Sequence, residues 1–257
     1  MHISGLFLYP IKSGAALSVA SWELDDRGLR HDREYMVVDE AGAFLTQREL
    51  PKLALVEAEL GEPLVVRTPL GAAAALPGAF RDIEVWGYEG RAADCGDEVA
   101  ELLSGFLDRS CRLVMAGPAL GRRSDDGASG IAFADGYPLL LIGEASLAAL
   151  NERLEQPLPM NRFRPNVVVA GSGPFEEDEW LHVELGTVGA DVVKPCLRCA
   201  ITRVDQATGV RGDGEPLRTL GQFRKVKGGV QFGQNLVHTG TGTLSVGDSV
   251  SVRERRS

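Results

Sequence analysis

Short apolar and β-branched stretches, separated by turn residues, make up most of this chain. In the first quarter of the chain they occupy residues 3–9, 20–24, 34–38 and 53–60. In the second half they occupy residues 138–142, 167–170, 180–185, 189–193, 200–204 and 249–252. Turn residues such as Asp39-Glu40-Ala41-Gly42 stand between these stretches, as they do between the strands of β proteins. The pattern therefore predicts a chain built mainly of short strands.

Two segments carry the period of a helix instead. In residues 97–107 the apolar positions recur at helical spacing, and Asp97 is the predicted N-cap. Residues 144–154 place three leucines on one face, with Pro157 just beyond the end, and a third short helix is expected to begin at Pro216. These segments add only a little helix to the strands.

Glycine, serine and charged residues dominate residues 117–130, which predicts a flexible loop and a domain boundary near it. The charged tail at 253–257 is expected to be frayed. We therefore expect a mostly β fold of the α+β kind, with a few covering helices and domains at 1–115 and 116–253.

Composition excludes several function classes. The 257 residues carry a formal charge of −9 at pH 7, which argues against general binding of a nucleic-acid backbone. No apolar run approaches the roughly 18 residues of a membrane span, and the chain opens on a predicted strand rather than a secretory signal. We therefore expect a soluble, cytoplasmic protein with reduced thiols. A zinc site lacks ligands, because there is one Cys-x-x-Cys pair and no histidine pair, and ferredoxin cysteine spacings are absent.

Of the four cysteines, Cys196 has the surroundings of a reactive thiol. It lies between Lys194 and Arg198 in a predicted turn, where both charges would stabilise a thiolate that binds soft metals or attacks electrophiles. A buried structural thiol, or half of a zinc-binding pair with Cys199, remains the alternative. Cys95 has acidic neighbours that should raise its pKa, and Cys111 has apolar neighbours, so both are expected to be structural.

Basic residues are expected to gather at one end of a small sheet. Lys12 and Ser13 follow the first predicted strand, Arg33 opens another, and Arg48 ends its neighbour. Together they would form a pocket for an anion such as phosphate, unless they are separate surface charges.

Arg164 and Asn166 flank Pro165, which biases Arg164 towards an extended backbone. Both side chains would then point to the same side and suit a flat heterocycle, or else form a salt bridge and a turn. Asp135, ahead of a buried strand, offers a further polar rim.

In chain order these pieces resemble the MOSC family, the molybdenum-cofactor sulfurase C-terminal domain proteins, in the branch with the mitochondrial amidoxime-reducing component and YcbX. The resemblance covers nearly the whole chain. Its motifs are Tyr9-Pro10-Ile11-Lys12-Ser13, Asp32-Arg33, Thr46-Gln47-Arg48, Asp94-Cys95-Gly96, Gly143-Glu144-Ala145-Ser146-Leu147, Phe163-Arg164-Pro165-Asn166, Cys196-Leu197-Arg198-Cys199, Thr202-x-Val204-Asp205, Thr208-Gly209 and Phe232-Gly233-Gln234.

The resemblance implies an N-terminal MOSC β-barrel domain, a MOSC β-barrel domain and a molybdopterin-bound molybdenum cofactor. Cys196 would ligate the metal, and Asp135 would lie near it, although Gly136-Tyr137 departs from the small hydroxyl residues expected there. Cys199 matches a family cysteine that is not a ligand. The cofactor phosphate would be held by Lys12, Ser13 and Arg33, and the pterin by Arg164 and Asn166, with Arg48 as a further cofactor-binding residue.

The activity implied is reduction of N-hydroxylated small molecules, independent of pyridoxal phosphate. The chain carries no cluster motif, so electrons are expected from a separate reductase or ferredoxin-like partner. The resemblance also indicates a bacterial-type protein without a membrane anchor. Two alternatives remain: a sulfur carrier that uses a Cys196 persulfide, and a cofactor-storage protein without turnover.

Overall fold

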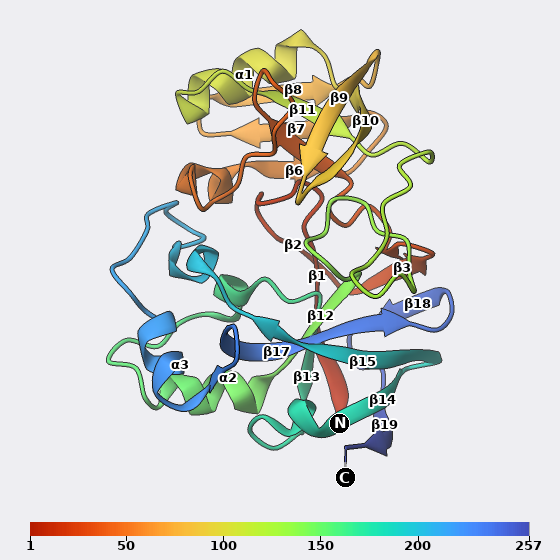
Figure 1. The fold of residues 1–257 in the computed structure, drawn as a ribbon, viewed down its shortest axis with the longest axis vertical. Coiled ribbons are helices and arrows are strands. Elements are labelled where there is room, and N and C mark those ends of the chain that lie inside the picture. The colour runs from red at the N-terminus through yellow and green to blue at the C-terminus, as the bar shows by residue number, and fades with distance from the viewer. Residues whose placement is uncertain (257) are drawn as a thin grey trace.

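The computed structural model describes residues 1–256 and is mostly β, as the pattern predicts. Figure 1 shows α1 and strands β6–β11 gathered at one end of the long axis and β12–β19 at the other. The larger body is built on a curled nine-stranded sheet in the order β19-β14-β15-β17-β12-β13-β1-β2, with β16 paired to β17. Its strands are β1 (His2–Leu8), β2 (Leu17–Val19), β12 (Leu139–Gly143), β13 (Val167–Ala170), β14 (Trp180–Leu185), β15 (Val188–Leu197), β16 (Lys225–Val226), β17 (Gly229–His238) and β19 (Val250–Arg255).

The smaller body consists of two sheets and one helix around their own core. Its strands are β5 (Tyr35–Val38), β6 (Glu57–Glu59), β7 (Leu64–Thr68), β8 (Gly71–Ala75), β9 (Phe80–Val85), β10 (Tyr88–Asp94) and β11 (Arg112–Met115). They pair in the orders β5-β11-β10-β9 and β6-β7-β8. Helix α1 (Asp97–Leu107) buries its apolar face, including Val99, Leu103 and Phe106, against these sheets.

The strands within the first 29 residues pair with the larger body, although they precede the smaller one in the chain. Strand β1 is antiparallel to β13, with Leu6 opposite Val167. Strand β3 (Ser21–Asp25) pairs with β4 (Gly28–Leu29) and with β18 (Gly242–Ser245) in a third small sheet. The division into domains at 1–115 and 116–253 therefore stays a prediction, and strand pairing crosses that boundary.

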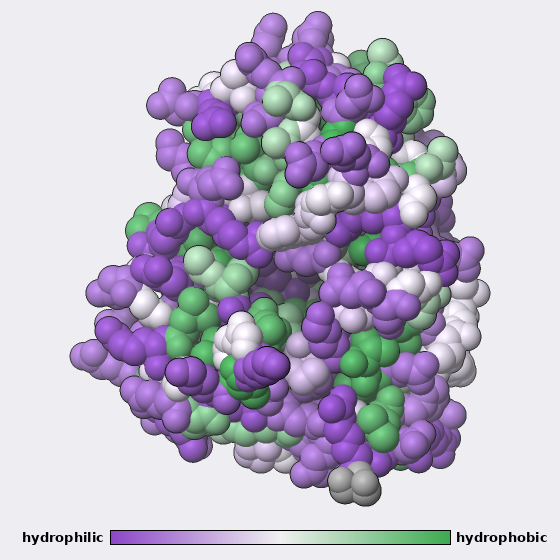
Figure 2. All heavy atoms as spheres, in the orientation of Figure 1, coloured by the Kyte–Doolittle hydropathy of each residue, from purple (hydrophilic) through white to green (hydrophobic). Residues whose placement is uncertain are grey.

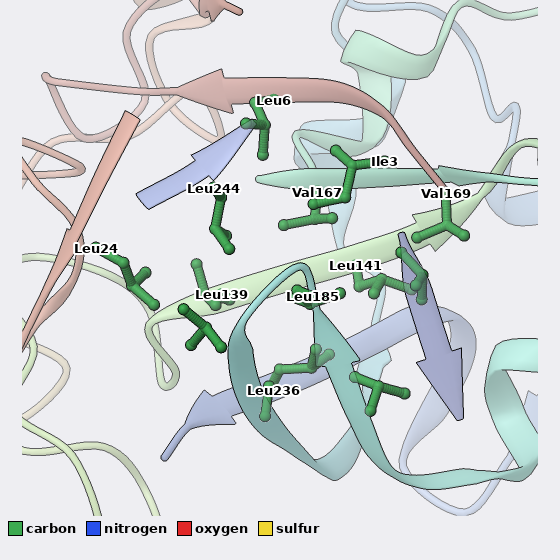
Figure 3. Packing of buried hydrophobic residues seen from close by; sticks show 14 of the residues in the cluster. Ile3, Leu6, Leu24, Leu139, Leu141, Val167, Val169, Leu185, Leu236 and Leu244 are labelled. Atoms are coloured by element: carbon green, nitrogen blue, oxygen red, sulfur yellow. The ribbon is translucent and has the colours of Figure 1, made fainter. Parts of the chain in front are cut away.

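The core of the larger body is continuous from the first strand to the last. Figure 3 shows aliphatic side chains from β1, β3, β12, β13, β14, β17 and β18 converging in it. Helices α2 (Glu144–Asn151) and α3 (Leu217–Phe223) help to cover a second cluster on this body, around Phe163 and Phe232. Burial of a large aromatic side chain contributes a few kcal/mol, so this second cluster holds the sheet firmly beneath the helices.

Four local predictions were wrong. Residues 200–204 form a 3₁₀ helix, η4 (Ala200–Arg203), rather than a strand, and 53–60 contain η1 (Pro51–Leu55) before β6. Two further 3₁₀ turns are η2 (Met160–Phe163) and η3 (Glu176–Glu179). The N-cap of α1 is Gly96, one residue before Asp97. The tail is strand to Arg255, because β19 pairs with β14 and Arg255 forms an ion pair with Glu176 of η3.

The loop 117–130 lacks regular structure, yet it is fastened to its surroundings. Arg122 is buried and donates to the carbonyl oxygens of Ala132, Ala134 and Asp135. Three carbonyl acceptors for one guanidinium hold the loop against the segment that leads into β12. None of the helices within residues 1–256 combines the length and apolar character needed to cross a bilayer.

We expect Gly42→Ala to destabilise the smaller body far more than Gly87→Ala. Both glycines have positive φ, +87° and +74°, so alanine at either position costs about 1–2 kcal/mol of backbone strain. Only at Gly42 would the new Cβ also lie 2.3 Å from a backbone oxygen, that of Asp82, adding about 1–3 kcal/mol. Urea unfolding monitored by circular dichroism measures both variants, and equal losses would contradict the steric argument.

Candidate functional site

A pocket between the two bodies collects all of the predicted site residues. Its volume, including the part open to solvent, is about 860 Å³. Figure 2 shows a hollow at the level where the bodies meet, with hydrophilic residues around much of it. The predicted residues that line the pocket are Lys12, Ser13, Arg33, Arg48, Asp135, Arg164, Asn166, Cys196 and Cys199.

Positive charge dominates the pocket wall. Five cations line it, namely Lys12, Arg33, Arg48, Arg164 and Arg198, whereas Asp135 is the one carboxylate among the described lining residues. The chain as a whole has a charge of −9, so this local excess is opposite in sign to the protein. A concave site with five cations attracts anions strongly.

Lys12 and Asp135 form the ion pair at the pocket rim. The Lys12 ammonium is buried and donates to the Phe133 carbonyl oxygen at 2.8 Å and to Asp135. Burial lowers the pKa of Lys12, an effect that Asp135 opposes. Desolvation acts to raise the pKa of Asp135, but the Lys12 charge outweighs it and holds that pKa well below its ordinary value. Asp135 is therefore ionised and serves as an acceptor.

Arg164 is a buried cation that has no carboxylate partner within residues 1–256. Its Nη1 donates to the carbonyl oxygen of Gly14 at 2.6 Å, and its guanidinium lies 4.2 Å from the Tyr9 ring centroid. Burial lowers the pKa of Arg164 to about 10. The extended backbone predicted for Arg164 was wrong: it ends the 3₁₀ helix η2 with φ of +56°, in the left-handed region.

Left-handed backbone recurs around this pocket. Ser13, Arg33 and Arg164 line it with φ of 64°, 50° and 56°, an uncommon conformation for residues other than glycine. Such strain persists where the surrounding structure fixes it, and it gathers at functional sites. Three such residues among those that line the pocket show that the surrounding fold fixes their backbone.

The Asn166 side chain is already hydrogen-bonded to other parts of the protein. Its Nδ2 donates to the Phe7 carbonyl oxygen at 3.1 Å, and its Oδ1 accepts from Leu140 N and Arg33 Nη1. The side chain therefore ties β1 to β12 and orients Arg33. Its predicted contact to a heterocycle stays a prediction.

Cys196 lies within strand β15 rather than in a turn, which corrects the sequence-based expectation. Its sulfur accepts from Arg198 Nη1 at 2.8 Å and packs against the aromatic cluster around Phe163 and Phe232. Burial raises the pKa of Cys196, although Arg198 acts in the opposite direction, so the predicted easy ionisation was wrong for this thiol. Lys194 turns away and pairs with Asp125 at 3.1 Å.

Cys199 is in the more polar position of the two pocket thiols. It directly precedes η4, and its sulfur accepts from Arg48 Nη2 at 3.2 Å. The same Arg48 nitrogen lies 3.9 Å from Asp135 Oδ2. Both thiols therefore accept from a pocket arginine, Cys199 from Arg48 beside Asp135 and Cys196 from Arg198, but Cys196 also packs against the apolar cluster.

The other two cysteines are structural, as predicted. Burial, with help from Asp94, raises the pKa of Cys95 to about 12, and burial also raises the pKa of Cys111. Both side chains belong to the core of the smaller body. All four cysteines are free thiols.

Two residues around the pocket had no site role in the sequence analysis. Arg198 was considered only as a neighbour of Cys196, yet it lines the pocket and donates to Phe163 O at 2.6 Å. Trp86 reaches the rim from the β9–β10 turn and donates to Asp135. The Trp86-Gly87 dipeptide was the available signal, because tryptophan is unusual in the turn of a hairpin.

Comparison with known proteins assigns the chain to a family. Residues 1–110 match the model of the MOSC N-terminal beta barrel domain, and residues 128–251 match that of the MOSC domain. The mouse mitochondrial amidoxime-reducing component 1 is 34% identical over 277 residues, covering 96% of this chain and 81% of the mouse protein. The cattle mitochondrial amidoxime reducing component 2 is 35% identical, covering 96% of this chain and 82% of that protein.

A rice molybdenum cofactor sulfurase is 32% identical over 264 residues, which cover 91% of this chain but 32% of the rice protein. Both domain models fall in chain order and together span most of the sequence. The chain therefore belongs to the MOSC family, with the N-terminal beta barrel domain followed by the MOSC domain.

Proposed function

We propose that this protein is a molybdenum-cofactor-dependent reductase of N-hydroxylated compounds that receives its electrons from a separate protein. The observation that carries the proposal is one pocket in which two thiols stand among five cations, in a chain similar to amidoxime-reducing components over 96% of its length.

The residues present fit such a cofactor. Arg164 is a buried guanidinium without an ion pair among the described residues, and the buried Nε of Arg198 has no hydrogen-bond partner there. Unpaired buried cations and donors are costly, and an anionic ligand with many oxygen acceptors would satisfy them. A thiolate supplies the soft donor that a molybdenum–dithiolene centre accepts. One pocket therefore offers cations for the negative charge of the cofactor, donors for its oxygen atoms and a thiol for its metal.

The pocket residues divide the binding task. Lys12, Ser13, Arg33 and Arg48 would hold the phosphate, and Arg164 with Asn166 would orient the pterin. One thiolate of the Cys196/Cys199 pair would ligate the metal. The sequence predicts Cys196, but the surroundings of the Cys199 sulfur favour Cys199 for this role. Asp135 stays ionised beside the cations and would orient a protonated substrate.

When bound, the cofactor would supply the redox chemistry: with two electrons and two protons, the N-bound oxygen of the substrate leaves as water and the N–H compound remains. The chain's own residues bind the anion, fix its orientation and carry charge at the rim. A separate reductase or ferredoxin-like protein would deliver the electrons. The cytoplasmic, bacterial-type location stays a prediction.

The proposal is tested on protein purified from a host that makes the cofactor. We expect stoichiometric molybdenum by elemental analysis, and reduction of an amidoxime to the amidine when a chemical reductant supplies electrons. Folded protein that contains neither molybdenum nor pterin would overturn the proposal. Protein that contains both but yields no amidine would leave the cofactor-storage alternative.

A sulfur-transfer function is the second candidate. The observation in its favour is the rice sulfurase relative, together with two thiols that line one pocket. A sulfur carrier needs a persulfide on one cysteine and has less use for an unpaired buried Arg164. Mass spectrometry of protein purified without reductant separates the two functions, because a persulfide adds the mass of one sulfur atom to a cysteine peptide.

A further inference from the structure

Trp86 occupies a backbone position that tryptophan disfavours. It forms, with Gly87, the two-residue turn between β9 and β10, and the two residues have φ of 52° and 74°. Hairpin turns of this kind favour asparagine, aspartate or glycine, because a larger side chain is strained at positive φ. In Figure 1 the β9–β10 hairpin reaches from the smaller body towards the larger one. Trp86 therefore departs from the residue preference of such a turn, at the place where the two bodies meet.

The indole meets the charged rim of the pocket through both its edge and its face. Its Nε1 donates to Asp135 Oδ1 at 3.1 Å, and the Arg48 guanidinium lies 4.8 Å from the ring centroid. The Lys12 ammonium lies 5.8 Å from the ring, and Phe44 packs at 4.8 Å between centroids. The side chain nevertheless stays 47% exposed. Burial alone does not explain why a tryptophan is strained here.

The partners of Trp86 are themselves connected. Asp135 Oδ1 accepts from Lys12 as well as from the indole, and Asp135 Oδ2 lies 3.9 Å from Arg48. Arg48 in turn donates to Cys199 Sγ at 3.2 Å. The indole therefore contacts both the carboxylate and the guanidinium that face each other across the rim. Without it, Asp135 would keep only its contacts to Lys12 and Arg48, and Arg48 only its contacts to Asp135 and Cys199.

We propose that Trp86 is a positioning residue that fixes Asp135 and Arg48 at the pocket rim, so that the cation cluster is preorganised for an anionic ligand. Backbone strain at the turn is tolerated because the indole is needed at this place. The inference rests on the proposed function for the identity of the natural ligand. Its test uses a simpler anion, so that each can fail separately.

Three variants of the full chain, produced without cofactor, form the test. Trp86→Phe keeps a ring over Arg48 but removes the indole N–H, and Trp86→Asn removes both while suiting the turn. Trp22→Phe is the matched control, because the Trp22 indole donates to the Arg30 carbonyl oxygen at 2.8 Å, outside the pocket lining. Inorganic pyrophosphate binding by calorimetry and the melting temperature are measured for each.

We expect Trp86→Phe to bind pyrophosphate about three- to tenfold more weakly than wild type, the effect of one net hydrogen bond. Trp86→Asn should bind more weakly still, with a melting temperature no lower than that of Trp22→Phe. Trp22→Phe should bind as wild type does. Molybdenum content of the same variants from a cofactor-producing host should follow the same order.

Wild-type pyrophosphate affinity in Trp86→Phe and Trp86→Asn would overturn the inference, whatever their melting temperatures. A lower melting temperature with unchanged affinity would assign Trp86 a purely structural role and would also overturn it. Wild-type protein that binds pyrophosphate but acquires no molybdenum would instead defeat the proposed function, and the dependence on Trp86 would still be measured.

Discussion

Cys199→Ala is expected to reduce both molybdenum affinity and the rate of amidoxime reduction by at least about 100-fold. Loss of a residue that only supports a metal ligand costs about 10- to 100-fold, and loss of the ligand itself should cost more. The expectation for Cys199 comes from its place in the pocket. The Cys199 sulfur accepts from Arg48 beside Asp135, within the cation cluster. Alanine removes the soft donor there and leaves the phosphate-binding cations in place. Elemental analysis and turnover with a chemical reductant measure the loss.

Cys196→Ala is the matched comparison, three residues away in the same pocket. Its sulfur lies on the aromatic cluster around Phe163 and Phe232, where alanine removes packing contacts. We expect this variant to lose some stability and to retain much more molybdenum than Cys199→Ala. The reverse order, with molybdenum lost from Cys196→Ala and kept in Cys199→Ala, would restore the assignment made from sequence. Equal retention in both variants would exclude a cysteine ligand.

Arg164→Met is expected to weaken pyrophosphate binding by about 10- to 100-fold, the range for one charge-assisted hydrogen bond. The free energy of unfolding of the cofactor-free protein should change much less. Methionine leaves the Gly14 carbonyl oxygen without its donor, which destabilises the fold, but it also removes a buried cation that lacks a counter-charge, which stabilises it. Calorimetry and urea unfolding separate the two effects.

Arg162→Met controls for the loss of an arginine in the same segment. Arg162 is 3.4 Å from Asp205 and does not line the pocket. This variant should bind pyrophosphate as wild type does. It should lose stability, because Asp205 is left without its ion-pair partner. If Arg164→Met binds pyrophosphate normally, Arg164 is a structural cation rather than part of the anion site.

Most of the strands and all three α-helices were predictable from sequence, because each depends on local periodicity and on turn residues nearby. Errors occurred where distant pairing decided the outcome. The tail is ordered because β19 pairs with β14. Residues 200–203 form a 3₁₀ helix because β15, with its pairing to β17, ends at Leu197. The partner strands β14 and β17 cannot be identified from the sequence around these segments.

The composition of the pocket was also predictable, because motifs in chain order indicated which residue types belong together. Its internal geometry was not. Arg164 was expected to be extended, but it ends a 3₁₀ helix in the left-handed region. Cys196 was expected to ionise readily, but Lys194 pairs elsewhere and burial raises the pKa of the thiol. Both outcomes depend on neighbours that are more than sixty residues away or on burial.

The sequence by itself determined the β-rich class, the helices, the excess of cations among the site residues and the family. Periodicity, residue chemistry and motif order are properties of the chain that do not require a third dimension. The tertiary structure alone decided that strand β1 joins the larger body, that Trp86 reaches the rim and that Cys199 contacts Arg48 beside Asp135 whereas Cys196 contacts Arg198 and the apolar cluster. The physical reason is that burial, ion pairing and hydrogen-bond partners depend on distances between residues far apart in sequence, and only the folded chain fixes those distances.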